Sequence, residues 1–156
     1  MSGISIAIMG AAVCAALAGC GSALGVMAAG KAAAGVTSEK PELFGRMLVL
    51  QALPGTQGIY GFLTAVLIMV RIGVLGGSPA ELTEAQGWAM FWAALPMAVV
   101  GLISGIAQGL TAASAIHMTG RQPDASGKGI TMTALVETYA ILALLTSILL
   151  VYGIAL

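Results

Sequence analysis

Charged residues are scarce in this sequence. They make up 8% of its 156 residues and cancel to a net charge of zero. Because an average soluble domain is about 25% charged, this deficit excludes an ordinary water-soluble protein. Without an excess of positive charge, there is also no electrostatic basis for binding nucleic acid. No glycine-rich phosphate loop with its lysine occurs, so we expect no ATP site on this chain.

Cysteine is equally scarce, with Cys14 and Cys20 as the only two. They lie six residues apart in an apolar stretch, a spacing that does not bring two side chains together on a helix. A disulfide or a metal site at this pair is therefore disfavoured. We expect both residues to act as small, buried hydrophobic side chains.

Long apolar runs, by contrast, fill most of the sequence. Four stretches are long enough to cross a membrane as helices, which takes roughly 20 residues each: 1–30, 47–70, 85–120 and 129–156. No cationic segment precedes the first stretch, so we interpret it as a retained helix and not as a cleaved signal peptide. The sequence thus predicts an all-α integral membrane protein with four transmembrane helices.

The few charges lie mainly between the spans. Connections 31–46 and 121–128 hold five of the six basic residues, whereas the middle connection holds Glu81 and Glu84. Cytoplasmic loops tend to be rich in Lys and Arg. We therefore expect loops 31–46 and 121–128 in the cytoplasm and both termini on the outer side of the plasma membrane. Arg71, at the outer end of the second span, is the one basic residue that opposes this orientation.

Three proline-containing segments predict where helices begin. Ser78-Pro79-Ala80-Glu81 has the form of a capping box with proline at the first helical position. Pro41-Glu42 and Pro123-Asp124 each place a proline and then an acid where a helix N-terminus favours them. We therefore expect the second and fourth helices to begin at Pro41 and Pro123.

The sequence matches itself when it is shifted by 82 residues. Segment 52–56 aligns with 134–138, and Pro41 aligns with Pro123. The repeat predicts two tandem helical hairpins, residues 1–76 and 77–156. Because each unit crosses the membrane twice, both copies keep the same orientation and are related by rotation about the membrane normal. The same contact repeated between chains would close a ring.

Small residues are concentrated in the first span and in the second half of the third. Such residues let helix backbones approach closely in lipid. The second and fourth spans carry large aliphatic and aromatic side chains instead. We expect the first and third spans to form a tightly packed inner wall, with the other two outside it and facing lipid.

Glu137 is the only carboxylate in the last apolar stretch. An acidic side chain near the middle of a membrane span costs about 2.5–3.5 kcal/mol on the mildest insertion scale. Such residues usually mark ion or proton pathways. We therefore interpret Glu137 as the carboxylate that carries an ion.

Further polar residues lie at similar depth. Leu53, Thr56, Gln57 and Tyr60 follow the spacing i, i+3, i+4 and i+7, which places them on one helix face beside the carbonyls freed by Pro54. Gln108 lies deep in the third span. Taken singly, the glutamines and Thr56 could simply bond neighbouring helices. Together with Glu137 they form a set of hard oxygen donors that suits an alkali cation or hydronium, and not zinc or copper.

Three segments carry a family resemblance: LPGTQGIYGF at 53–62, SGIAQG at 104–109 and VETYAIL at 136–142. They resemble the 16-kDa proteolipid rotor subunits of V-type ATPases, especially those of the bacterial sodium-translocating type. The resemblance covers nearly the whole chain. It implies a membrane ring of about ten identical subunits, a stator subunit that supplies an arginine, and a central stalk seated on the cytoplasmic loops.

The resemblance also implies roles for the polar residues. Glu137 matches the essential carboxylate, and Tyr60 matches the residue that hydrogen-bonds it. The implied sodium ligands are Leu53 through its carbonyl, the side chains of Thr56, Gln57 and Gln108, and Glu137. No resident cofactor is implied beyond the transported Na⁺ or H⁺.

The sequence therefore predicts a rotor subunit that carries Na⁺ across the membrane while ATP is hydrolysed elsewhere in the complex. The same rotor role with H⁺ is the main alternative, because proton-pumping relatives keep the carboxylate. A stand-alone small transporter would need an aqueous pathway, for which the chain offers few polar residues. A structural pore protein is the remaining alternative, and in it the carboxylate would matter little.

Overall fold

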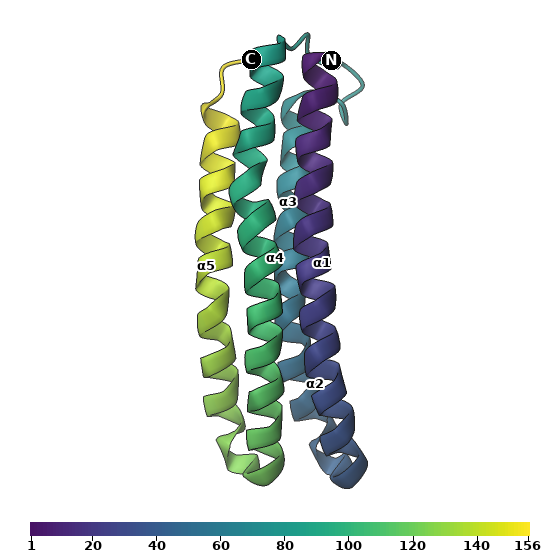
Figure 1. Cartoon of the computed structure of the whole chain (residues 1–156), viewed down its shortest axis with the longest axis vertical. Coiled ribbons are helices and arrows are strands. Elements are labelled where there is room, and N and C mark those ends of the chain that lie inside the picture. The colour runs from purple at the N-terminus through teal and green to yellow at the C-terminus, as the bar shows by residue number, and fades with distance from the viewer.

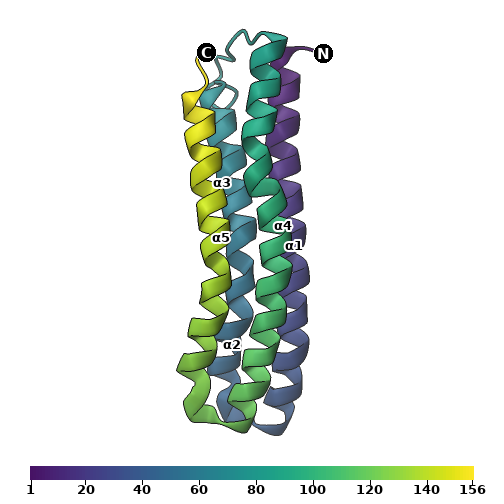
Figure 2. The same ribbon diagram turned by 60° about the vertical axis from the view of Figure 1, so that its left-hand side comes forward.

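The computed structural model describes residues 1–156 as a bundle of four parallel helical columns without any strand (Figures 1 and 2). The elements are α1 Gly3–Glu39, α2 Phe44–Ala52, α3 Thr56–Arg71, α4 Glu84–Arg121 and α5 Ser126–Gly153, with short 3₁₀ segments at Pro41–Leu43, Leu53–Gly55 and Pro123–Ala125. All four columns are long and apolar enough to cross a membrane. The predicted fold class, an all-α membrane protein of four transmembrane helices, is confirmed.

Both termini lie at one end of the bundle, and the turns from α1 to α2 and from α4 to α5 lie at the other (Figure 1). The helix starts predicted at Pro41 and Pro123 are confirmed. The predicted loops 31–46 and 121–128 are wrong in extent, because only Lys40 and Gln122 interrupt the helices there. The chain can reverse so abruptly because the N–H of Lys40 still bonds the Val36 carbonyl while Pro41 starts the next segment.

The predicted capping box at Ser78–Glu81 is also wrong. Helix α4 begins at Glu84, and Thr83 caps it. The Thr83 hydroxyl accepts from the Gln86 N–H at 3.3 Å, and the Gln86 side chain accepts from the Thr83 N–H at 2.9 Å. The backbone N–H of Ser78 bonds Gly73 and so keeps this region in a turn. Thr83-x-x-Gln86 is thus the motif that forms the reciprocal bonds.

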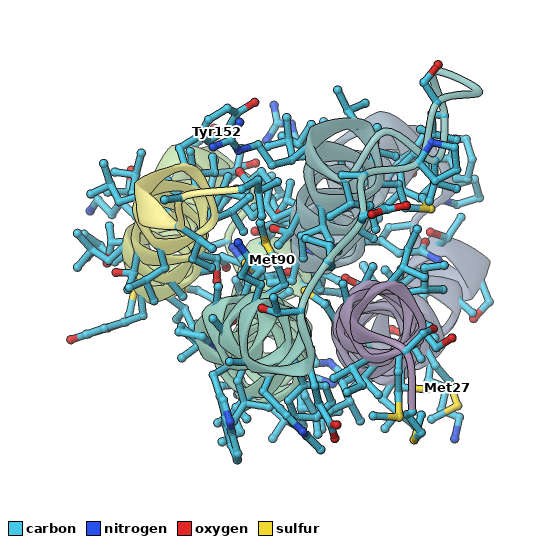
Figure 3. The ribbon with its side chains drawn as sticks, turned by 90° about the horizontal axis from the view of Figure 1, so that it is seen from above. Met27, Met90 and Tyr152 are labelled. Atoms are coloured by element: carbon cyan, nitrogen blue, oxygen red, sulfur yellow. The ribbon has the colours of Figure 1, made fainter.

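Helices α1 and α4 form the tight inner pair that the small residues predicted. A Cβ atom added to Gly25 would lie 2.2 Å from the Gly105 carbonyl oxygen, and one added to Gly109 would lie 2.2 Å from the Gly25 Cα. Only glycine permits this approach of the two backbones. Seen along the bundle, α3 and α5 lie on the opposite side from this pair (Figure 3).

The buried apolar residues form two clusters, one toward the termini and one toward the turns. Met90 belongs to the first cluster and lies between the helices (Figure 3). Cys14 is also buried there, as expected, but Cys20 is exposed, so the prediction of two buried cysteines is half wrong. The reason is that Gly21, not Cys20, faces α4. Polar side chains occupy the level between the two clusters.

Candidate ion-binding site

Pro54 divides the second column into α2 and α3. Because proline has no N–H, the helical bond to the Leu50 carbonyl is missing, and residues Leu53–Gly55 tighten into a 3₁₀ turn. The Leu53 carbonyl accepts a hydrogen bond of 3.0 Å from the Thr56 hydroxyl. The kink therefore places a backbone oxygen and a hydroxyl side by side at the level of the polar residues.

Two carboxamides connect α3 to the second hairpin. The Gln57 side-chain nitrogen donates to the Gln108 side-chain oxygen at 2.6 Å, and the Gln108 nitrogen donates to the Thr133 carbonyl at 3.1 Å. Both glutamines have 0% of their surface exposed. The Thr56 hydroxyl lies 3.4 Å from the Gln57 oxygen. This chain of bonds runs from α3 through α4 to α5.

Glu137 lies beside this chain on α5 and is half-buried. The Tyr60 hydroxyl donates to its carboxylate and is its only hydrogen-bond partner in the structure. The Tyr60 carbonyl in turn accepts from the fully buried Thr64 hydroxyl at 2.9 Å. Charge-assisted bonds to a carboxylate are the stronger kind, so Tyr60 holds Glu137 against α3.

All six residues predicted for the site are brought to one level of the bundle, where α3, α4 and α5 meet. They fall into two bonded groups: the Leu53, Thr56, Gln57 and Gln108 group, and the Tyr60–Glu137 pair. Sequence reasoning missed Thr133, which contributes its backbone carbonyl to Gln108. Its position one helical turn before Glu137 was the only available signal, because a carbonyl leaves no mark on residue type.

Glu137 is the only acidic side chain in this region, and its neighbours are neutral oxygens. The structure contains no group of three or more His, Cys, Asp or Glu residues that could hold a metal ion. Such a site lacks the soft or imidazole ligands of transition metals. One carboxylate with a single positive charge makes a neutral pair, which reduces the cost of placing the site inside a membrane.

The family model for the C subunit of ATP synthase matches this chain twice, at residues 9–68 and at residues 91–150. The chain belongs to this ATP synthase family. Both the starts and the ends of the two matches are 82 residues apart (91 − 9 and 150 − 68). This offset equals the internal shift found in the sequence, so each copy of the family's unit covers one pair of columns.

Two relatives refine the position of the chain within the family. It is 45% identical over 149 residues to V-type sodium ATPase subunit K of Enterococcus hirae, covering 96% of this chain and 92% of the relative. It is 43% identical over 143 residues to A-type ATP synthase subunit K of Methanocaldococcus jannaschii, covering 92% of this chain and 61% of that relative. The resemblance to V-type proteolipids that the three motifs indicated is confirmed.

Proposed function

We propose that this chain is a rotor-ring subunit of a V-type ATPase membrane sector and carries Na⁺ across the membrane during ATP-driven rotation. The carrying observation is the pairing of Glu137 with Tyr60 beside the two buried carboxamides. The 45% identity to a sodium ATPase subunit K supports the same function. ATP would be hydrolysed by other subunits of the complex.

In this proposal the ion is bound by oxygen atoms from both hairpins. The ligands are the Leu53 carbonyl, the Thr56 hydroxyl, the oxygens of Gln57 and Gln108, and Glu137, while Tyr60 positions the carboxylate. Na⁺ is favoured over H⁺ because a proton needs only one acceptor, whereas four neutral oxygens beside a carboxylate suit a cation that has lost its water. Glu137 changes partners, from Na⁺ to another cation, when the ion leaves.

Release of the ion requires a positive charge that this chain does not place near Glu137. Arg71 lies at the terminal end of the bundle, where it bonds the Ile154 carbonyl at 3.1 Å and lies over the Tyr152 ring. We propose that identical copies form a ring and carry each Glu137 to an arginine of a stator subunit. That charge would displace Na⁺ electrostatically, and the site would refill from the other side.

A stand-alone transporter is disfavoured by where the surface is hollow. The polar residues lie between two apolar clusters. A hollow of about 630 Å³ lies instead at the turn end, lined by residues such as His117 and Arg121. A transporter acting alone would need a water-filled path from such a hollow to Glu137, whereas a rotor subunit exposes its carboxylate sideways.

The chain is a multi-pass membrane protein, and we propose that its turn end is cytoplasmic. Lys40 and Arg46 bind carbonyls of Gly120 and Pro123 there, so basic residues of the first hairpin hold the end of the second. The positive-inside tendency then places both termini outside the plasma membrane, and the stalk would dock on the turns. We also propose that residues 1–76 and 77–156 are the two structural units.

Labelling of Glu137 by a hydrophobic carbodiimide tests this function in the assembled complex. A carboxylate exposed to lipid in the ring should react, and Na⁺ should slow the reaction at a pH where the acid form is present. Labelling that Na⁺ does not slow would favour H⁺ as the carried ion. An absence of labelling at Glu137 would contradict the rotor proposal.

A further inference from the structure

The internal repeat relates a covered face of α3 to a bare face of α5. The positions on α3 that face the second hairpin are buried or half-buried: Leu53, Thr56, Gln57, Tyr60 and Leu67. Their equivalents 82 residues later are all exposed, and their large members have exposed fractions of 63% at Leu135, 66% at Tyr139, 62% at Leu142 and 73% at Leu149. The face that makes the contact between hairpins therefore exists twice but is covered once.

The complementary face shows the same asymmetry. On α4, Gly101, Gly105 and Gly109 are buried against α1. Their equivalents on α1 are Gly19, Ala23 and Met27, of which the last two are exposed. Met27 points away from the bundle (Figure 3). The chain thus carries one uncovered face of each kind, on opposite sides of the molecule.

Two polar side chains on these uncovered faces have no hydrogen-bond partner within the chain. Tyr139 lies two residues after Glu137 and so at the level of the ion site. Gln51, the equivalent of Thr133, lines a groove between α1 and α2. Tyrosine facing lipid normally lies at the membrane–water interface. Deep in a membrane, an unpaired hydroxyl or carboxamide costs free energy that a partner would recover.

We propose that neighbouring copies in the ring meet through these two faces, with the Tyr139 hydroxyl of one copy bonded to the Gln51 carboxamide of the next. This inference rests on the ring assembly proposed above. The contact between copies then repeats the contact between hairpins, and it satisfies both unpaired polar groups at once. Exposed Ile103 and Leu110 of α4 pack against Ala23 and Met27 of the next copy.

The substitutions between the two contacts are mutually consistent. Inside the chain, Gln57 and Gln108 together bridge to the Thr133 carbonyl. Between copies, Tyr139 replaces Gln57, Val26 replaces Gln108 and Gln51 replaces Thr133. A longer side chain thus meets a shorter one, and Gln51 supplies the partner in place of a backbone carbonyl.

The same repeat explains why the contact between copies binds no ion. The position of Glu137 is Gly55 there, and that of Gln108 is Val26. Neither residue brings an oxygen-bearing side chain, so a cation would find no countercharge. The ring accordingly alternates between an ion site within each copy and an ion-free contact between copies.

Cysteine cross-linking in the assembled ATPase tests this contact. In a Cys14→Ala, Cys20→Ala background, Gln51→Cys with Tyr139→Cys should give a ladder of oligomers with a short thiosulfonate cross-linker. The control pair, Ile59→Cys with Ile141→Cys, is exposed in both repeats and should stay monomeric. An intact ring in which only the control pair cross-links would overturn the contact but leave the rotor proposal standing. Absence of any ring would overturn both.

A double-mutant cycle adds a readout that needs no cross-linker. Tyr139→Phe and Gln51→Leu should each lower the temperature at which the purified ring dissociates, and the double variant should lower it no further than the larger single effect. Tyr152→Phe is the matched control, because its exposed hydroxyl also lacks a partner but lies at the end of α5. Additive effects of the two changes would contradict a direct bond.

Discussion

Glu137 and Gly55 occupy equivalent positions in the two hairpins, and their surroundings differ as much as the residues do. Glu137 is bonded by Tyr60 and lies beside two fully buried carboxamides. At Gly55, an added Cβ would meet only a methyl group of Val26, at 3.9 Å. One hairpin therefore supplies the charge, while the other leaves its equivalent position empty.

The first hairpin nevertheless contributes most of the candidate ligands. Leu53, Thr56, Gln57 and Tyr60 all come from it, while Gln108 and Glu137 come from the second. After duplication, each hairpin retains a different half of one site. This division leaves one carboxylate for four crossings, so a ring of such subunits would move fewer ions in each turn. Fewer ions per turn allow the same ATP to sustain a steeper ion gradient.

Replacing the charged member of the pair should have the largest effect. Glu137→Gln removes an attraction of about 4 kcal/mol, for charges 4 Å apart at an effective dielectric constant of about 20. Na⁺ binding should weaken about 10³-fold, and Na⁺ transport by the complex in proteoliposomes should be lost. Native mass measurement should still show the ring. Glu81→Gln, in the exposed outer loop, serves as the control, and normal transport by Glu137→Gln would refute the site.

Closing the glycine contact between the hairpins should have the next largest effect. A methyl group at Gly25 would lie 2.2 Å from a backbone oxygen of α4 that cannot move aside cheaply. Overpacking of this kind costs about 1–3 kcal/mol, so Gly25→Ala should reduce ring yield and its dissociation temperature. Gly35→Ala lies on the same helix with open space around it and should cause no loss. Equal effects of both changes would mean that close packing is not the cause.

The fold was largely predictable because membrane crossing depends on apolar length, which composition reveals directly. Pro41 and Pro123 also marked helix starts reliably, since proline fits the first turn and little else in a helix. The cap at Thr83 was missed because Ser78–Glu81 has a similar motif, and only the backbone bonds of the turn decide between them. Cys20 was misplaced because the sequence does not fix the rotation of α1 to within one residue.

The candidate site was predictable to the extent that it lies on one helix. The spacing of Leu53, Thr56, Gln57 and Tyr60 fixes a shared face without any knowledge of packing. The bond from Gln57 to Gln108 depends on how α3 and α4 lie side by side, which no local pattern encodes. The ion-binding role of all these residues remains a prediction until it is measured.

Removing one carboxamide should distinguish a cation cage from a simple bond between helices. Gln57→Leu leaves Gln108 buried without its donor, at a cost of about 1–3 kcal/mol in stability. The double change Gln57→Leu, Gln108→Leu removes both partners and should recover part of that stability. Na⁺-dependent protection of Glu137 should stay impaired in the double variant, because the ligand oxygens are still missing. Recovery of protection along with stability would show that the carboxamides are structural only.

The smallest effect, but the sharpest comparison, comes from two threonines that differ only in the hairpin they occupy. Thr56 and Thr138 lie 82 residues apart, and each hydroxyl bonds the carbonyl three residues earlier, at 3.0 and 2.8 Å. The local cost of changing either to valine should therefore be the same. Only Thr56 also lies against the Gln57 oxygen. Thr56→Val should raise the Na⁺ concentration that half-protects Glu137 about 2–10-fold, as expected for one hydrogen-bonding oxygen, whereas Thr138→Val should not change it. Equal shifts would place the cause in the shared helical bond and remove Thr56 from the ligand set.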